Sequence, residues 1–333
     1  MSTPPGFHVQ LRPSGHRFQA AESRSVLQAG LDAGFSLPYS CRTGHCRSCR
    51  ARVVSGRVDH AATPLNYLTP EQRDKGYALL CQARPLSDLE LLVDELTLER
   101  IQPREMPCRV RRIRRLAPDV AALDLRLPMN ENFRFAAGQF VDVLLADGRT
   151  RSYSMATVPK AQGVIDLEIH VRHVPGGLFT DRVFGSLREG ELLRLRGPLG
   201  SFHLREDSDR PIVFLASGTG IAPILSMIGD AALRASNRSM RLYWGGRREA
   251  DLYLPAPPGV PFVPVLSEQE GPGRTGFVHA AVMQDLPDLS GHDVYACGAP
   301  AMVEAARRDF IGRCGLPEQQ FFADAFLTQA DLP

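Results

Sequence analysis

The sequence predicts a multi-domain protein with a small α+β domain, an antiparallel β-barrel and an α/β domain with a parallel sheet, in that order. A chain of 333 residues is long enough for two or three domains, each with its own core. Six short β-like segments follow one another between residues 108 and 196, separated by turn residues. Beyond residue 207, apolar strand-like runs alternate with glycine turns and helical patterns, which is typical of parallel sheets.

The composition is that of a globular protein with no strong electrostatic preference. Hydrophobic residues make up 44%, and 39 Lys plus Arg against 37 Asp plus Glu give a formal net charge of +2. We therefore expect neither nucleic acid nor a membrane among the partners. The N-terminus lacks the pattern of a secretory signal, and the most apolar stretch, 212–228, is interrupted by glycine and proline. These features predict a cytoplasmic protein.

Four of the seven cysteines form a metal-ligand pattern. Cys41, Cys46 and Cys49 are spaced C-x4-C-x2-C, and Cys81 follows far downstream. This is the spacing with which plant-type ferredoxins bind a [2Fe-2S] cluster. A zinc site that recruits His45 or His60 is the alternative, but zinc sites usually have two separated C-x2-C pairs or Cys/His pairs, and this chain has one C-x2-C pair. The spacing therefore predicts that these four cysteines are cluster ligands.

The residues around the cysteines predict a small sheet with short helices. Alternation of apolar and polar residues predicts hairpins over 7–20 and 51–60, and helical periodicity predicts a helix over 25–33. Thr69 and Gln72 stand as the N-cap and capping-box residues of another short helix, with a proline at its first position.

This first part of the chain resembles a known domain. Residues 6–96 are similar to a complete plant-type ferredoxin, and the resemblance implies a β-grasp-like fold. We expect the domain to span 1–99. Residues 100–107 are polar and interrupted by proline, which predicts a linker.

The second predicted domain, 108–206, is an antiparallel barrel. Its β-like segments lie at 108–115, 120–127, 139–145, 151–156, 165–172 and 192–196. Arg151, Tyr153 and Ser154 form an R-x-Y-S motif that resembles the ferredoxin-NADP reductase family. The resemblance implies that the arginine pairs with a flavin phosphate, the tyrosine covers the isoalloxazine ring, and the serine hydroxyl faces flavin N5. A planar guanidinium, an aromatic ring and a short hydroxyl suit these roles.

A glycine turn follows the fifth barrel segment. His170 precedes Gly176, Gly177 and Thr180, which open a helical pattern where a pyrophosphate could meet free N–H groups. We therefore include these four residues in the predicted flavin site. The stretch 197–202 reads G-P-L-G-S-F and resembles the turn with which the same family closes its barrel.

The third predicted domain, 207–333, binds the nicotinamide nucleotide. Its strands are predicted at 211–217, 240–245, 261–266 and 293–296. Gly218, Thr219 and Gly220 follow the first of them and open a helix, which places a dinucleotide at the carboxyl ends of the strands. The turn lacks the third glycine of the usual Rossmann fingerprint, but it resembles the G-T-G-I-A-P turn of the ferredoxin reductase family.

Two later segments complete the predicted site. Cys297 and Gly298 belong to a C-G-A-P turn, and the family resemblance implies that the cysteine lies near nicotinamide C4. Asp324 and Phe326 lie in a C-terminal strand whose acid and aromatic ring approach the flavin in that family. With Ser154, the resemblance implies that Cys297 and Asp324 are the catalytic residues.

The second strand of this domain ends at Arg247, Arg248 and Glu249, which bears on the choice of nucleotide. An acidic residue near the ribose selects NADH, and an arginine there accommodates the phosphate of NADPH. Both types are present. We expect NADH to be preferred, with appreciable use of NADPH, and Arg247 to contact the NADPH phosphate.

The three motif sets together cover residues 6–327. Their order resembles the reductase components of bacterial multicomponent, ring-hydroxylating oxygenases, and most closely the naphthalene-dioxygenase-type reductases. The resemblance implies an enzyme that passes electrons from NADH through FAD and a [2Fe-2S] cluster to an oxygenase or its ferredoxin. A reductase that serves a deoxysugar dehydrase is the alternative, and a redox sensor without turnover is a third. We expect a monomer.

Overall fold

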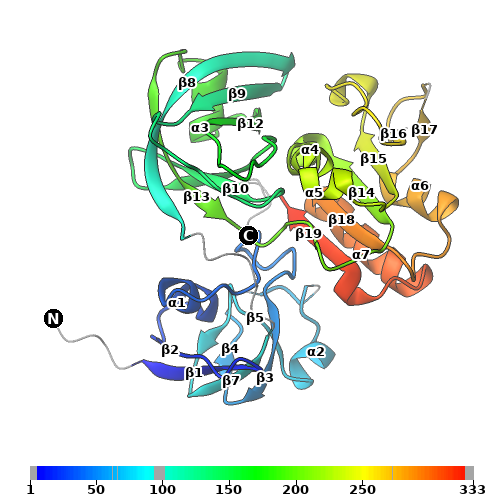
Figure 1. The fold of residues 1–333 in the computed structure, drawn as a ribbon. Coiled ribbons are helices and arrows are strands. Elements are labelled where there is room, and N and C mark those ends of the chain that lie inside the picture. Colours follow the sequence, from blue (N-terminus) through cyan, green and yellow to red (C-terminus); the bar gives the residue numbers. More distant parts are fainter. Residues whose placement is uncertain (1–5, 62, 66, 94–101, 272, 327–333) are drawn as a thin grey trace. The chain divides into compact units, whose positions relative to one another are not determined.

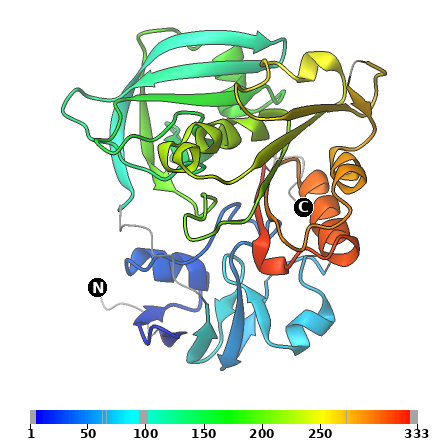
Figure 2. The same ribbon diagram turned by 45° about the vertical axis from the view of Figure 1, so that its right-hand side comes forward.

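The computed structural model describes residues 6–61, 63–65, 67–93, 102–271 and 273–326. It divides into two compact units, Met1–Gln102 and Pro103–Pro333, whose elements are labelled in Figure 1 and seen from a second direction in Figure 2. Among the described residues, none of the helices is long and apolar enough to cross a membrane.

The first unit is built on a five-stranded mixed sheet in the order β2-β1-β7-β3-β5, in which β1 and β7 run parallel. A second, two-stranded sheet pairs β4 with β6. The strands are β1 (Phe7–Arg12), β2 (Arg17–Ala20), β3 (Arg50–Ser55), β4 (Val58–Asp59), β5 (Tyr77–Leu79), β6 (Arg84–Pro85) and β7 (Leu89–Leu92), and the helices are α1 (Val26–Asp32) and α2 (Pro70–Asp74).

Both predicted helices of this unit are confirmed, with their caps. The Ser25 hydroxyl accepts a hydrogen bond from the first turn of α1. Thr69 and Gln72 form the full reciprocal capping box at the start of α2, and each side chain accepts a hydrogen bond from the other's backbone N–H.

The predicted hairpin over 51–60 is wrong in its pairing. Both strands exist, but β3 pairs with β5 and β7, whereas β4 pairs with β6. The cause lies at Gly56, whose φ is +97° and whose Cα passes so close to the backbone of Asp88 that a Cβ would lie 2.1 Å from its carbonyl oxygen. The chain therefore turns toward residues 84–88 instead of folding back on β3.

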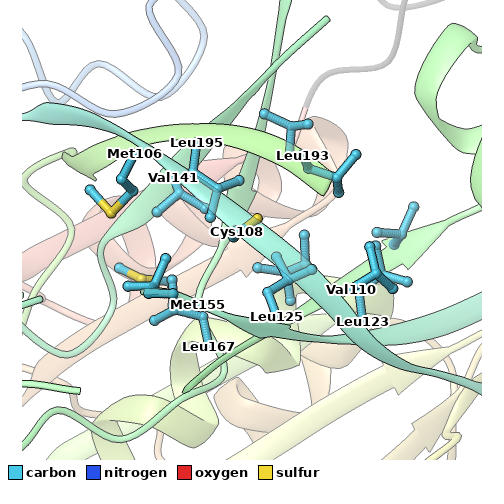
Figure 3. Packing of buried hydrophobic residues seen from close by; sticks show 14 of the residues in the cluster. Met106, Cys108, Val110, Leu123, Leu125, Val141, Met155, Leu167, Leu193 and Leu195 are labelled. Atoms are coloured by element: carbon cyan, nitrogen blue, oxygen red, sulfur yellow. The ribbon is translucent and has the colours of Figure 1, made fainter. Parts of the chain in front are cut away.

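The second unit begins with the predicted antiparallel barrel. Its six strands are β8 (Arg104–Ala117), β9 (Val120–Arg126), β10 (Phe140–Leu144), β11 (Thr150–Ser154), β12 (Asp166–Arg172) and β13 (Leu192–Leu199), in the order β11-β10-β13-β8-β9-β12. A bridge between Met155 and Ile169 joins the two edges and closes the barrel. Figure 3 shows the side chains that fill it, including Val110, Leu125 and Leu195.

Two boundaries of the barrel differ from the sequence prediction. β8 begins at Arg104, so residues 104–107 are strand and not linker. Met106 is buried there, because alternate residues of this polar stretch face the core. β13 extends to Leu199, so the first part of the predicted closing turn, Gly197, is still in the sheet.

The rest of the second unit is a six-stranded sheet in the order β17-β16-β15-β14-β18-β19, and its strands are all parallel, as predicted. The strands are β14 (Ile212–Ser217), β15 (Met240–Gly246), β16 (Phe262–Leu266), β17 (Arg274–Thr275), β18 (Asp293–Gly298) and β19 (Phe321–Ala325). The helices of this unit are α3 (Leu178–Phe184), α4 (Ile221–Gly229), α5 (Ala231–Ala235), α6 (Val278–Asp285), α7 (Pro300–Arg313) and the single turns η1 (Gly218–Gly220), η2 (Glu249–Asp251) and η3 (Glu318–Gln320).

Helices cover both faces of this sheet. Trp244 of β15 belongs to the same apolar cluster as α4, whereas its neighbour Gly245 packs against Val278 of α6. Because successive residues of a strand face opposite sides, α4 and α6 cover opposite faces. The carboxyl ends of the parallel strands then meet at one edge, and the turns that follow β14 and β18 lie side by side there.

Candidate functional site

The four predicted cluster ligands come together in the first unit. Cys41, Cys46 and Cys49 lie on the loop between α1 and β3, and Cys81 follows β5. The backbone N–H of Leu80 donates to the Cys49 carbonyl at 3.0 Å, which ties the two segments together. The thiols are hydrogen-bonded as two pairs, Cys41 with Cys46 and Cys49 with Cys81.

This arrangement of two thiol pairs fits a [2Fe-2S] cluster. Such a cluster, held by four cysteines, takes two thiolates on each iron. Backbone N–H groups of Cys41, Thr43 and Cys46 point at the sulfurs of this loop at 3.4–3.5 Å, and such contacts stabilise a cluster. The nearby His45 instead bonds Thr43 and packs on the Tyr67 ring.

The R-x-Y-S motif lies on β11, at the edge of the barrel sheet. Val141 of β10 pairs with Tyr153, and Phe140 pairs with Ser154. The Tyr153 ring packs 5.4 Å from the Phe179 ring of α3, and burial raises the pKa of its hydroxyl. The Ser154 hydroxyl is buried. The tyrosine and serine are therefore held rigidly at one end of the barrel.

Arg151 and the glycine turn at Gly176 and Gly177 are further parts of the predicted flavin site. The Arg151 guanidinium is half-buried and donates to the carbonyl of Thr150 at 2.8 Å. The Thr180 hydroxyl donates to the Val174 carbonyl at 2.9 Å and thereby braces the turn. Gly177 has no room for a side chain beside Thr180, whereas Gly176, with φ at +80°, faces open space. The turn at Gly176 thus leaves space beside the backbone for a phosphate group. The Gly176 N–H itself donates to the Asp181 carboxylate at 3.0 Å.

His170 has its ring engaged by protein groups on both sides. Its Nδ1 lies 3.0 Å from the Tyr253 hydroxyl, and its Nε2 lies 2.8 Å from a Glu168 carboxylate oxygen. The imidazole is buried. Both ring nitrogens of His170 thus contact protein groups, and the residue joins the barrel to the parallel-sheet part of the unit.

The two predicted nicotinamide turns touch each other. A Cβ on Gly220 would lie 2.1 Å from the Cys297 carbonyl oxygen, and a Cβ on Gly298, with φ at +136°, would lie 2.3 Å from the Ser217 hydroxyl. That hydroxyl accepts the N–H of Ala299 at 2.9 Å. Both glycines are therefore required for the turns after β14 and β18 to meet.

Cys297 and Asp324 are paired neighbours on β18 and β19. Both are buried. Burial, and then the charge of Asp324, raises the pKa of the Cys297 thiol well above its usual range, so the thiol is neutral at physiological pH. The Phe326 N–H donates to the Gly298 carbonyl at 2.8 Å, which holds the C-terminal segment at the same edge of the sheet.

Three residues that the sequence reasoning did not select complete this site. Arg172 of β12 lies against the turn at Gly218; its Nε lies 3.5 Å from the Asp119 carboxylate, and its Nη2 is buried without a hydrogen-bond partner. The Trp244 indole donates to the Gly218 carbonyl at 3.1 Å, and its ring packs edge-to-face on Tyr253. A guanidinium with one nitrogen left without a hydrogen-bond partner beside a glycine turn fits an anionic group such as a nucleotide phosphate. In the sequence, the only feature that marks Arg172 as a possible site residue is its position two residues after His170.

Arg247 lies at the exposed end of β15. Its side chain is 62% exposed, and its guanidinium lies 3.6 Å from the carboxylate of Asp251. The same carboxylate accepts the backbone N–H groups of Arg247 and Arg248 at 2.8 and 3.2 Å. Asp251, rather than the predicted Glu249, is therefore the acidic group fixed at this position.

Comparisons with protein families match three consecutive parts of the chain. Residues 9–86 match the 2Fe-2S iron-sulfur cluster binding domain, 107–204 the oxidoreductase FAD-binding domain and 214–308 the oxidoreductase NAD-binding domain. The domain order and the cofactors predicted from the sequence are therefore confirmed.

Relatives match over nearly the whole chain. The CDP-6-deoxy-L-threo-D-glycero-4-hexulose-3-dehydrase reductase of Yersinia pestis is 41% identical over 330 residues, which cover 96% of this chain and 98% of that protein. Reductase component 1 of a Comamonas terephthalate 1,2-dioxygenase is 34% identical and covers 96% and 97%. Among solved structures, an Amycolatopsis cytochrome P450 reductase matches with a TM-score of 0.75 at 36% identity, covering 96% and 98%.

Proposed function

Because the chain belongs to the family of NAD-dependent reductases with FAD and [2Fe-2S] domains, we propose that it delivers electrons from NADH, one at a time, to a separate acceptor protein. Bound FAD supplies the conversion between the two-electron chemistry of a nicotinamide and the one-electron chemistry of a cluster. The observation that carries the proposal is the set of two thiol pairs in a compact unit of its own. Electron transfer to a small two-electron acceptor would not need it.

The residues proposed for each group are those predicted from the sequence, with one addition from the structure. The cluster ligands are Cys41, Cys46, Cys49 and Cys81. The flavin site comprises Arg151, Tyr153, Ser154, His170, Gly176, Gly177, Thr180 and Phe326. The nicotinamide site comprises Gly218, Thr219, Gly220, Arg247, Cys297 and Gly298, to which we add Arg172.

Ser154, Cys297 and Asp324 are the proposed catalytic residues, and none of them needs to act as a strong base. The buried Ser154 hydroxyl can orient a ring by hydrogen bonding, and the neutral Cys297 thiol fills the turn against which a nicotinamide would lie. Burial of all three side chains keeps water away from the reacting atoms. Positioning and exclusion of water are thus the contribution of this chain to hydride transfer.

The proposal is tested with Cys46→Ser. Ferricyanide can accept electrons from the flavin, so its NADH-dependent reduction should be retained within about twofold. Reduction of cytochrome c should fall by at least about tenfold, because its one-electron route through the cluster is lost. Iron content and flavin content are measured on the same sample, and Cys108→Ser, which removes a buried cysteine of the barrel, is the control. Unchanged cytochrome c reduction in a variant that lacks iron would contradict the proposed route.

For the acceptor we propose an oxygenase component or its small ferredoxin, supported by the dioxygenase reductase among the relatives. A deoxysugar dehydrase is a second candidate, favoured by the 41% identity to the Yersinia reductase. Purified terephthalate dioxygenase and the Yersinia dehydrase, each with its substrate, distinguish the two. The true class of partner should accelerate NADH oxidation, and the other should leave it at the basal rate.

Three further properties are proposals of the same kind. We propose a monomer, which size-exclusion chromatography with light scattering tests. We propose a cytoplasmic location, supported by seven cysteines that form no disulfide. We also propose that the FAD and nicotinamide domains meet at residues 206 and 207, a division supported by the gap between the last barrel strand and β14.

A further inference from the structure

We propose that the surface around the cysteine loop is a positively charged docking site for an acceptor protein with an acidic face. The inference rests on the proposed function and adds the chemistry of the partner. Each of the three loop cysteines is followed directly by an arginine, namely Arg42, Arg47 and Arg50. Residues 33–58 contain five arginines and no aspartate, glutamate or lysine, although the whole chain is almost neutral. The loop and the strand after it thus carry a local excess of positive charge.

Packing and backbone geometry hold these arginines at the loop. The Arg42 guanidinium lies 5.2 Å from the centre of the Tyr39 ring, and that of Arg50 lies 4.8 Å from the Tyr77 ring. Arg42 and Arg47 have φ values of +57° and +62°, which is uncommon for residues with side chains. The charges are therefore carried by the same turns that present the sulfurs.

The positive surface continues along β3. Arg52 is exposed and lies on the same face of the strand as Arg50, because the buried Ala51 between them faces the core. We call the arginines of the loop and of this strand the arginine face: Arg42, Arg47, Arg50 and Arg52.

An acidic protein is the occupant that this face favours. Complementary charge accelerates encounter and orients the partner, and redox complexes are small and short-lived, so local charge can dominate their formation. An electron can leave most directly where the cluster ligands lie, and Arg42, Arg47 and Arg50 each directly follow one of these cysteines in the chain. A cationic acceptor would be repelled from the same position.

The test compares two haem proteins of opposite charge as one-electron acceptors, anionic cytochrome b5 and cationic cytochrome c. With the holoenzyme and NADH, cytochrome b5 reduction should slow by about tenfold as NaCl rises from about 20 to about 500 mM, because the Debye length shrinks. Cytochrome c reduction should not slow. Arg47→Glu and Arg52→Glu should each lower the low-salt rate with cytochrome b5 several-fold, whereas Arg47→Lys should retain it.

Arg17→Glu is the matched control. Arg17 is exposed on β2, at the opposite edge of the sheet from β5, and its replacement should leave the cytochrome b5 rate unchanged. Equal salt responses of the two haem proteins, or full activity of both glutamate variants, would overturn the inference. Slower reduction of the cluster by NADH in Arg52→Glu, measured as bleaching of the cluster absorbance, would also overturn the inference. The arginine would then act on electron transfer within the chain and not on docking of the partner. If the unmodified enzyme reduces ferricyanide but neither haem protein, the proposed function itself fails.

Discussion

Arg247 and Asp251 lie together at the end of β15, and they have opposite consequences for nucleotide choice. The carboxylate is fixed by two backbone N–H groups, whereas the guanidinium is mostly exposed. A fixed acid suits the free ribose hydroxyl of NADH, and a mobile arginine can turn toward the phosphate of NADPH. This pairing explains why the sequence motif alone left both nucleotides open.

We expect Arg247→Ala to raise the KM for NADPH about tenfold, the effect of losing one charge-assisted contact, and to change the KM for NADH less than about twofold. Steady-state ferricyanide reduction with each nucleotide measures both values on one preparation. Equal effects on NADH and NADPH would show that Arg247 does not contact the phosphate.

His203 gives the second unit a pH-dependent stability. Burial, reinforced by the positive charge of Arg205, lowers the pKa of its imidazole from 6.5 to about 4. Its Nδ1 lies 2.8 Å from the Leu204 carbonyl, and its Nε2 accepts from the Arg205 guanidinium at 3.0 Å, which requires the neutral ring. The unfolded chain therefore binds a proton at a higher pH than the folded chain does.

The sign of the effect follows from that difference. Above about pH 6.5 both states are neutral and the residue contributes nothing to pH dependence, whereas between pH 6.5 and 4 the free energy of unfolding falls as the pH falls. We expect a loss of about 2 kcal/mol from this group between pH 7.5 and pH 5. Urea unfolding of the unmodified protein and of His203→Gln at both pH values isolates it. A variant with the same pH response as the unmodified protein would refute the assignment.

Among the elements, η1 and the end of β18 meet so closely that added volume cannot be accommodated. Gly220→Ala would place a methyl group 2.1 Å from the Cys297 carbonyl oxygen, so the two turns must separate. We expect a loss of about 1 to 3 kcal/mol in the free energy of unfolding and a much larger loss of NADH affinity. Gly312→Ala is the control, because a Cβ there meets nothing within 4 Å and lies in helix α7. Calorimetry and NADH titration of the two variants should differ sharply, and similar behaviour would contradict the close contact.

Local patterns predicted the elements better than they predicted long-range pairing. The capping box at Thr69 and the glycine turn at Gly218 depend on adjacent residues, and both were read correctly. The hairpin over 51–60 was wrong because the close approach of Gly56 to Asp88 depends on a chain segment 32 residues away. For the same reason, the bond between His170 and Tyr253, 83 residues apart, left no trace in either local sequence.

At the scale of the whole molecule, the two compact units have separate interiors. The first buries residues such as Leu11, Leu80 and Leu91, and the second has its own barrel and sheet clusters. Separate interiors allow one unit to unfold while the other remains folded.

We therefore expect Cys46→Ser to lower the melting temperature of the first unit and to leave that of the second within about 2 °C. Differential scanning calorimetry follows both transitions, and the fluorescence of released flavin identifies the second. A single transition that shifts as a whole would show that the units unfold together.

The pairing of Cys49 with Cys81 has a consequence for how the protein is made. These residues are 32 positions apart, and β3, α2 and β5 lie between them. A shared iron would close this stretch into a loop, and removing the chain entropy of a loop of that length stabilises the folded state by about 3 to 4 kcal/mol. During synthesis the ligand set is incomplete until residue 81 has left the ribosome. Supply of iron and sulfide would thus limit the yield of folded protein in the cell, as well as its redox activity.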